Sequence, residues 1–499
     1  MFERPPFLVD DVDTPALREA ISLMSRAGYC EIAVRERLGL HDITDLHWRS
    51  LPIYRDERLT ERDPLALAIE LFLLQGSIAV DDAERLLPSA SREVLLRTKL
   101  LEIDEAGGMR ARASLFPVGE RLIFADHAWP ELPYPGYAKV PYDHVMAIGL
   151  DSRHLARVTI RRPVRSALDL CTGSGIHALL AAAHAQRVIA VDINPRAINC
   201  TRFNASALGA ANLQVIAGDL FGPIGDERFD LITANPPFVP SPVNALGFRD
   251  GGPSGEDIQK RIVAGLPQHL EPGGMAQIVT ELGEREGEPL TTRLREWLAG
   301  APMDIYVLRV ASHSAAQYAV GHASGGDYGS FLDSARAWAG NLRAQGYARV
   351  ISVLIAFQWS SPDCGPPWDR TDESRPPQRS AGPEIEDTFR AERLARNPKL
   401  SRYLEGGRVH TAGPIALLDA SVLGEAIPPK AKATRLGQAL SIEHRLEPLE
   451  RQILARMEGC EVTELFRFGR ELGAEEGVVI EAIRSLLRRR LVWIDVPRE

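Results

Sequence analysis

The chain has 499 residues, apolar residues make up 45% of it, and its formal net charge is −9 with a pI near 5.8. This length predicts two to four domains, and the acidic balance excludes a protein coated in nucleic-acid-binding charge while leaving room for a local basic patch. The five cysteines are scattered and form no CxxC pair, which predicts a protein without disulfides or a metal site. The N-terminus is acidic and unlike a signal peptide, and no apolar run approaches the ~20 residues of a membrane span. Together these features predict a soluble cytoplasmic protein.

The first 140 residues predict a helical region that resembles a winged helix. Residues 14–50 carry apolar side chains at helical spacing. In "DPLALAIELFLLQG", Asp63 suits a helix N-cap, Pro64 the first turn and Gly76 the stop. Two further helical runs lead into "EAGGMRARASLFPV", which predicts a hairpin around Gly107 and Gly108. The proline-rich and aromatic stretch at 127–144 is expected to be an ordered linker.

From about Arg165 the pattern changes to short β-rich runs that alternate with helical runs. This alternation predicts an α/β fold, a Rossmann-like sheet with seven strands, over residues 141–360. The predicted strands are "SALDL", "RVIAVDI", "LQVIAGD", "FDLITAN", "MAQIVTEL", "DIYVLRV" and "RVISVLIAFQW".

The rest of the chain is predicted to be a linker and a C-terminal region. Residues 361–384 read as a mobile proline-rich linker, and residues 385–499 as winged-helix-like in their second half. "LLRTKLLEID" (95–104) resembles "LLRRRLVWID" (486–495), which leaves open a duplicated unit or a chance likeness of two amphipathic helices. Arg488 to Arg490 suit either nucleic-acid phosphates or a solvated helix end.

A glycine turn in "ALDLCTGSGIHALL" predicts a nucleotide-type site. Gly173 and Gly175 follow a strand and open a helix, where the backbone approaches a ligand closely. About 20 residues further on, Asp192 ends "VIAVDI" and suits ribose hydroxyls. With Ala178 the spacing also fits the dinucleotide fingerprint, so the turn alone does not separate NAD from S-adenosylmethionine. His177, on the following helix, lines the cofactor pocket or lies at the helix surface, and we expect the surface.

Three further features favour S-adenosylmethionine over a dinucleotide. Asp169 precedes the glycines, where a carboxylate suits a sulfonium and an ammonium better than a pyrophosphate. Asp219 ends the third strand and can accept a hydrogen bond from an adenine amine. The run Asn235-Pro236-Pro237-Phe238 ends the fourth strand. Each aspartate alone fits a helix cap, but the ordered set at successive strand ends indicates one ligand crevice.

These motifs resemble the class I S-adenosylmethionine-dependent methyltransferases, and most closely the release-factor glutamine N5-methyltransferases and related small-domain RNA and amino-group enzymes. The resemblance covers about Arg165 to Trp359 and rests on "DLCTGSG", "VDINPRAI", "GDLF", "FDLITANPPF", "DGGPSGEDI" and "LEPGG". It implies S-adenosylmethionine as cofactor, with binding residues Asp169, Cys171, Thr172, Gly173, Gly175, Asp192, Ile193, Asn194, Asp219, Leu220 and Asn235. It implies catalytic roles for Asn235, Pro236, Pro237 and Phe238.

The resemblance also implies methylation of a planar –NH2 group. The Asn235 side-chain oxygen and the Pro236 carbonyl are expected to accept the two N–H groups, and they would stabilise charge that develops on the nitrogen. The prolines fix φ, Phe238 offers a flat face for the acceptor, and no strong general base is required until the nitrogen has become acidic. Two departures stand out: Cys171 replaces the family's first glycine, and Phe238 stands where the glutamine enzymes typically have Tyr.

The acceptor stays open between a glutamine amide on a translation protein, such as a release factor, and a base in RNA or DNA. The acidic pI and the loop "DGGPSGED", in which Asp250 or Glu256 is a candidate substrate contact, favour protein. The winged-helix-like flanks and Phe238 favour nucleic acid. We favour the protein amide. Other classes are a winged-helix regulator that only senses S-adenosylmethionine and an NAD-dependent oxidoreductase, both disfavoured by the intact Asn235–Phe238 run.

Overall fold

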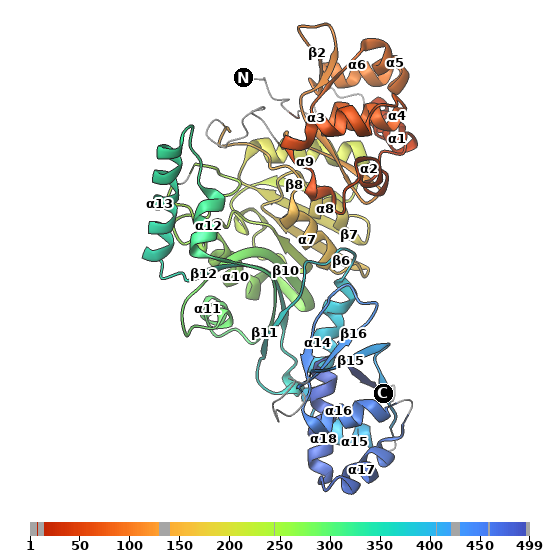
Figure 1. Ribbon diagram of the computed structural model, residues 1–499, viewed down its shortest axis with the longest axis vertical. Helices are drawn as coiled ribbons and strands as arrows, with labels where there is room; N and C mark the ends of the chain where they lie inside the picture. The colour runs from red at the N-terminus through yellow and green to blue at the C-terminus, as the bar shows by residue number, and fades with distance from the viewer. Residues whose placement is uncertain are drawn as a thin grey trace. The chain divides into compact units, whose positions relative to one another are not determined.

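The computed structural model describes residues 7, 14–128, 140–243, 245–405, 407–420, 430–457 and 460–495, so most of the predicted linker at 127–144 lies outside the described residues. Two compact units make up the chain (Figure 1). The first unit comprises Met1–Ala156, Arg162–Ala299 and Ser312–Val353, and the second comprises Arg157–Arg161, Gly300–Ala311 and Leu354–Glu499. The four sequence-based domain ranges differ from these units and stay a prediction. No helix in the described ranges is long and apolar enough to cross a membrane.

The N-terminal part of the first unit is helical, as predicted, and ends in short antiparallel strands. Asp63 caps its helix by accepting a hydrogen bond from the Ala66 amide at 2.8 Å, and Gly107 turns the predicted hairpin with a φ of +80°. The elements are α1 (Thr14–Arg26), α2 (Glu31–Leu38), α3 (Leu51–Ile53), α4 (Pro64–Ala68), the π-helical η4 (Ile69–Leu73), β1 (Ser77–Ile78), α5 (Val80–Leu86), α6 (Ser89–Arg97), β2 (Leu101–Ile103), β3 (Met109–Ala111), β4 (Ser114–Val118) and β5 (Arg121–Ala125). The winged-helix assignment stays a prediction.

The main sheet is Rossmann-like, and all seven predicted strands are present. Its order is β13-β11-β12-β10-β9-β6-β7-β8, and β10, β9, β6, β7 and β8 pair in parallel. The strands are β6 (Val164–Leu170), β7 (Ala185–Asp192), β8 (Leu213–Ala217), β9 (Phe229–Ala234), β10 (Leu270–Glu284), β11 (Met303–Ser314), β12 (Arg349–Trp359) and β13 (Asp369–Glu373).

The eighth strand, β13, corrects the sequence prediction, because it lies inside the range expected to be a mobile linker. Its sequence "DRTDE" has no apolar residue, so no periodic pattern of apolar residues could predict it. Backbone pairing with β11 forms it instead, from Ile305 opposite Asp369 to Arg309 opposite Glu373. A polar edge strand of this kind is a common end to a sheet.

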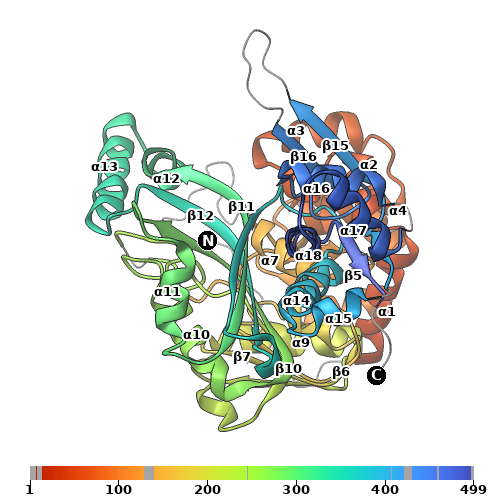
Figure 2. The same cartoon turned by 90° about the horizontal axis from the view of Figure 1, so that it is seen from below.

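Helices connect the strands, and two of them were not predicted as separate elements. α9 packs on β7 and β8, and α10 packs on β10. Between β11 and β12 the chain forms the helix pair α12 and α13, which lie side by side in both views (Figures 1 and 2). The helices are α7 (Leu150–Val158), α8 (Ile176–Ala181), α9 (Pro195–Leu208), α10 (Asp257–His269), α11 (Leu290–Trp297), α12 (Ala315–His322) and α13 (Tyr328–Ala344).

One hydrophobic core joins the N-terminal elements of the first unit to α8 and α9. Phe203 on α9 is fully buried and packs against Phe7 and Phe124, with ring centroids 6.1 and 5.6 Å apart. The buried Asn204 side chain bonds both the amide and the carbonyl of Phe124, at 2.9 and 2.8 Å, and the carbonyl of Ser174 at 2.9 Å. The N-terminal strands are therefore fixed to the helices that follow β6 and β7.

The second unit has its own core around α18. α14, α16 and α17 pack on α18, and β18 pairs antiparallel with β14. The elements are α14 (Gly382–Arg396), α15 (Leu400–Leu404), β14 (Val409–Thr411), β15 (Ile415–Ala420), β16 (Lys430–Arg435), β17 (His444–Arg445), α16 (Pro448–Arg456), α17 (Val462–Glu471), α18 (Glu476–Arg488) and β18 (Val492–Ile494).

The two similar sequence stretches share an unusual backbone conformation. Two residues beyond the ends of α6 and α18 stands a basic residue in the left-handed region, Lys99 at φ +56° and Arg490 at φ +57°. The hydrogen bonds agree as well: the Leu100 amide reaches the Leu95 carbonyl at 2.8 Å, and the Leu491 amide reaches the Leu486 carbonyl at 3.0 Å. Both helices then enter a short strand.

The basic run at the end of α18 is engaged within the second unit. Arg488 and Arg489 approach Glu392 and Glu450 at 3.5 and 2.5 Å. Arg490, 4% exposed, donates to the Glu384 carbonyl at 2.9 Å. These contacts do not support the phosphate-binding alternative and give the run a structural role.

Candidate active site

The register of the parallel strands brings the predicted site residues to one edge of the sheet. Leu170, the last residue of β6, lies opposite Val191 of β7 and Ala234 of β9. Asp192 lies opposite Ala217, the last residue of β8. The glycine turn, Asp192, Asp219 and Asn235 therefore begin side by side where four adjacent strands end, which is where ligands bind in such sheets.

Asp192 is held by the glycine turn and keeps room for a ligand. Its two carboxylate oxygens accept hydrogen bonds from the Gly173 amide at 2.9 Å and the Asn194 amide at 2.8 Å. Burial raises the pKa of this carboxyl, and the two amide bonds oppose that shift. Each oxygen keeps a further lone pair that a ribose hydroxyl can use.

The glycines of the turn are needed for two different reasons. Gly173 has a φ of +58° and open space where a Cβ would stand, so its face is accessible to a ligand. At Gly175, φ is +84° and a Cβ would lie 2.8 Å from Thr201 Cγ2. The Thr201 hydroxyl in turn donates to the Gly173 carbonyl at 3.0 Å. This open cradle beside a carboxylate fits the ribose end of S-adenosylmethionine.

Asp169 is buried and hydrogen-bonded within the protein. It is 1% exposed and accepts hydrogen bonds from Thr172 Oγ1 at 2.6 Å, Thr233 Oγ1 at 2.8 Å and the Ala178 amide at 3.2 Å. Burial raises its pKa to about 6. It ties the turn to β9 and α8, and its influence on the cofactor's charged groups stays a prediction. His177, expected at the helix surface, is also buried at 4% exposure.

Cys171 holds the turn in a conformation that glycine adopts more easily. Its φ is +55°, in the left-handed region, where a glycine would be free of the strain that a Cβ brings. Burial and the neighbouring carboxylate of Asp192 raise the pKa of the thiol. The thiolate is therefore disfavoured, and the geometry gives no support to a nucleophilic role.

The adenine side of the predicted site is open. Ile193 is 71% exposed, an unusual fraction for an isoleucine beside a buried strand, and it offers an apolar face. Leu220 is 8% exposed with a φ of +50°. Asp219 forms an ion pair with Arg261 of α10 at 2.7 Å, and the side chains of both are 51% exposed. The adenine contact predicted for Asp219 therefore competes with Arg261.

Asn235 is oriented by a residue that the sequence did not reveal. Its side-chain Nδ2 donates to the hydroxyl of Ser152 at 3.1 Å. Ser152 lies in the first turn of α7 and is 4% exposed. Among the described residues no donor reaches Asn235 Oδ1, so this oxygen can accept a further hydrogen bond. The two residues are 83 positions apart, and no motif marks the serine.

The prolines and Phe238 are braced by the glycine-rich loop before α10. The amides of Phe238 and Val239 donate to the Arg249 carbonyl at 3.1 and 2.9 Å. A Cβ at Gly255, whose φ is +73°, would lie 2.4 Å from the Phe238 carbonyl oxygen, so only glycine fits. This close approach explains why the loop has a glycine at position 255.

Phe238 corrects the sequence prediction of an open stacking face. It is 8% exposed and belongs to an apolar cluster that includes Val239, Tyr318, Trp338 and Tyr347. Half of its buried residues come from α12 and α13, which were not foreseen. Phe238 therefore anchors the Asn235–Phe238 run to the helix pair.

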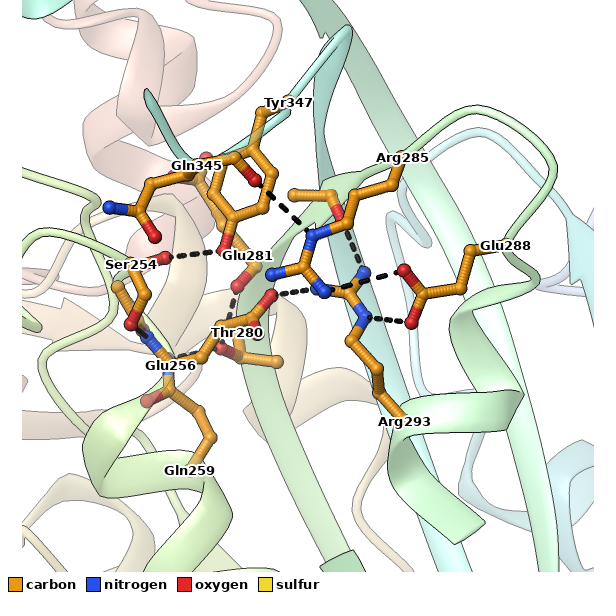
Figure 3. A network of polar contacts seen from close by, with 12 residues as sticks. Ser254, Glu256, Gln259, Thr280, Glu281, Arg285, Glu288, Arg293, Gln345 and Tyr347 are labelled. Atoms are coloured by element: carbon orange, nitrogen blue, oxygen red, sulfur yellow. Dashed lines mark hydrogen bonds and ion pairs between the residues drawn. The ribbon is translucent and has the colours of Figure 1, made fainter. Parts of the chain in front are cut away.

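Asp250 and Glu256, the predicted substrate contacts, are engaged inside the protein. Asp250 is 5% exposed and accepts hydrogen bonds from the amides of residues 245 and 246 at 2.9 and 3.0 Å. Glu256 is 7% exposed and pairs with Arg293 of α11. Figure 3 shows this ion pair within a network that also links Tyr347 to the Ser254 carbonyl, at 3.0 Å. Both carboxylates stabilise the loop instead of facing a substrate.

The comparisons with known proteins find a methyltransferase domain in this part of the chain. Residues 149–297 match the family model of the methyltransferase small domain, and residues 26–112 match a domain of unknown function (DUF7059). The ribosomal protein uL3 glutamine methyltransferase of Bradyrhizobium diazoefficiens is 40% identical over 134 residues, which is 24% of this chain and 41% of that protein. The release factor glutamine methyltransferase of Geobacter sulfurreducens is 36% identical over 154 residues, 27% of this chain and 54% of that protein.

The chain thus spans about half the length of the curated relatives it matches. A solved ribosomal protein L11 methylase from Lactobacillus delbrueckii subsp. bulgaricus is 18% identical and covers 42% of this chain and 78% of its own, with a TM-score of 0.25, a similarity too low to add to the argument. Residues 149–297 are a methyltransferase small domain of the class I, S-adenosylmethionine-dependent kind, related to the release-factor and uL3 glutamine methyltransferases.

Proposed function

We propose that the protein transfers a methyl group from S-adenosylmethionine to the side-chain amide nitrogen of a glutamine in a translation protein. The observation that carries the proposal is the orientation of Asn235. Ser152 engages its Nδ2 at 3.1 Å and leaves Oδ1 to accept an N–H of the acceptor amide. The names of the relatives, glutamine methyltransferases of a release factor and of ribosomal protein uL3, support the choice of acceptor.

The protein's residues divide the work of binding and catalysis. In this proposal Asp192 holds the ribose hydroxyls and Ile193 lies along the adenine, while Gly173 admits the ligand to the turn. S-adenosylmethionine, when bound, supplies an electrophilic methyl group on a positively charged sulfur. Asn235 Oδ1 and the Pro236 carbonyl hold the acceptor nitrogen and stabilise the charge that develops on it.

The burial of Phe238 weakens the case for a nucleobase acceptor. Stacking of a base on Phe238 would need an accessible ring face, yet the ring is 8% exposed and packs against α12 and α13. A glutamine amide needs hydrogen-bond acceptors and no stacking face. A cytoplasmic location belongs to the same proposal, because the proposed substrates are translation proteins.

Labelled S-adenosylmethionine tests the proposed acceptor. The protein is incubated with the label and, separately, with purified release factor, purified uL3 and ribosomal RNA, and an Asn235→Ala variant serves as the inactive control. We expect label on one of the two proteins, located by mass spectrometry on a glutamine side chain. Label that survives protease and is released by nuclease would contradict the proposal and select a nucleobase.

A further inference from the structure

Glu281 is a half-buried acidic residue on β10, the strand that pairs with β9, which the Asn235–Phe238 run follows. In the register of β9 and β10, Ala234 lies opposite Ile278, so Glu281 stands three residues beyond the level of the last residue of β9. β10 continues to Glu284, past the end of β9 at this edge of the sheet.

Glu281 is held in place through both carboxylate oxygens. Tyr318 of α12 donates its hydroxyl to Oε2 at 2.5 Å, and Ser352 of β12 donates to Oε1 at 3.1 Å. Tyr318 belongs to the same apolar cluster as Phe238. Asp151, which interacts electrostatically with Glu281, is the neighbour of Ser152, the residue that orients Asn235. Glu281 is thus linked, through Tyr318 and through Asp151 beside Ser152, to the elements that hold Phe238 and Asn235.

Methylation of an amide releases one proton. The N–C bond forms, the C–S bond breaks with its electron pair left on sulfur, and the nitrogen must lose one of its two hydrogens to stay neutral. Asn235 Oδ1 and the Pro236 carbonyl can accept hydrogen bonds but hold a proton poorly. We propose that the Glu281 carboxylate receives this proton and passes it to water; the inference rests on the proposed function.

The electrostatics of the site support this role. Burial raises the pKa of Glu281 to about 7, the negative charge of Asp151 adds to the rise, and the hydrogen bonds from Tyr318 and Ser352 oppose it. Asp151 itself has a pKa raised to about 6 by burial. Near Tyr318 stand two further groups: Arg249, which interacts with its hydroxyl, and His322, whose ring stacks on it at 4.1 Å. A base with a pKa near the working pH transfers protons most effectively.

Replacing Glu281 tests the inference through rate and pH together. Single-turnover transfer to the labelled acceptor should rise with pH to a plateau above about 7 in the wild type. Glu281→Gln should transfer about 10²–10⁴ times more slowly and lose that rise, because the proton acceptor is gone. Glu286→Gln, in the exposed turn after β10, is the matched control and should keep the wild-type rate and profile.

Two neighbours should move the pH profile in opposite directions. Tyr318→Phe removes a hydrogen bond that lowers the pKa of Glu281, so the half-maximal pH should rise. Asp151→Asn removes a negative charge that raises this pKa, so the half-maximal pH should fall. A residue that only supports the fold would not produce this pair of opposite shifts.

Infrared titration of the ligand-free protein gives a readout that needs no substrate. The wild type should show a protonated-carboxyl band that disappears near pH 7 and is missing in Glu281→Gln. A wild-type rate and profile in Glu281→Gln would overturn the inference alone. If Glu281→Gln does not fold, the pH profiles of Tyr318→Phe and Asp151→Asn test the inference instead. The absence of their two opposite shifts would overturn it. A wild-type protein that labels no acceptor would overturn the proposed function, and the inference with it.

Discussion

At the scale of single residues, the motifs located the site but not the roles of its side chains. Asp192 and Asn235 could be found because each follows a strand in a recognisable pattern. Asp169 was found by the same reasoning, yet its hydrogen bonds to Thr172 and Thr233 give it a structural role that depends on tertiary contacts. Ser152 was missed because no local pattern marks a contact across 83 residues.

Replacing Cys171 with glycine should stabilise the protein. The change relieves a left-handed strain of about 1–2 kcal/mol, which exceeds the added chain entropy of about 0.5–1 kcal/mol. We expect a gain of about 0.5–1 kcal/mol in urea unfolding, with transfer activity retained. Cys171→Ala keeps a Cβ and should bring no such gain. Loss of transfer in the glycine variant would point to a chemical role for the thiol.

Replacing Asp192 with alanine should weaken S-adenosylmethionine binding. The lost hydrogen bonds to a charged acceptor are worth about 1.5–3 kcal/mol. Calorimetry measures the loss of S-adenosylmethionine affinity. Asp226→Ala, on an exposed loop, is the control. An unchanged affinity in Asp192→Ala would remove the ribose assignment.

At the scale of elements, strand order followed from the sequence while two elements did not. Seven strands have apolar runs from which they could be predicted. β13 lacks such a run and forms by pairing with β11. The pair α12 and α13 reads as an ordinary helical stretch, and only packing reveals that it holds Phe238 and contacts the loop through Asn341, which donates to the carbonyls of Pro240 and Pro253 at 3.1 and 2.9 Å.

The loop before α10 should tolerate no side chain where it meets the acceptor run. Gly255 and Gly287 have nearly the same φ, +73° and +74°, but only Gly255 faces a crowded backbone. Gly255→Ala should therefore cost more stability than Gly287→Ala, which bears only the left-handed strain of about 1–2 kcal/mol. It should also reduce kcat, because the Phe238 carbonyl must shift. Equal losses in thermal unfolding would show that the close approach carries no constraint.

At the scale of the whole molecule, the sequence suggested separate domains where the first unit has a shared core. Composition and pattern describe segments well, but the packing of Phe7 and Phe124 on Phe203 of α9 joins distant segments and leaves no local trace. The N-terminal region is therefore part of the support of the cofactor turn, through Asn204 and Ser174. Whether the flanks also bind a substrate stays a prediction.

Phe203→Ala should destabilise this shared core as one body. Removing a fully buried phenylalanine costs about 3–5 kcal/mol. Denaturant unfolding, followed by hydrogen exchange of the N-terminal helices α1 to α6 and by loss of S-adenosylmethionine binding, should shift by the same amount with both probes. Two separate transitions would mean that the N-terminal region unfolds independently of the cofactor turn.

The central claim is that Asn235 holds the reacting nitrogen, and one measurement tests it most directly. Single-turnover methyl transfer is compared with S-adenosylmethionine titration for the wild type and Asn235→Ala. The strand still ends at the same place and Asp192 is untouched, so cofactor affinity should change little. Transfer should fall by about 10²–10³, the usual loss for one preorganised group that faces developing charge. Transfer at the wild-type rate would contradict the account, because the run from Asn235 to Phe238 would then be only a turn.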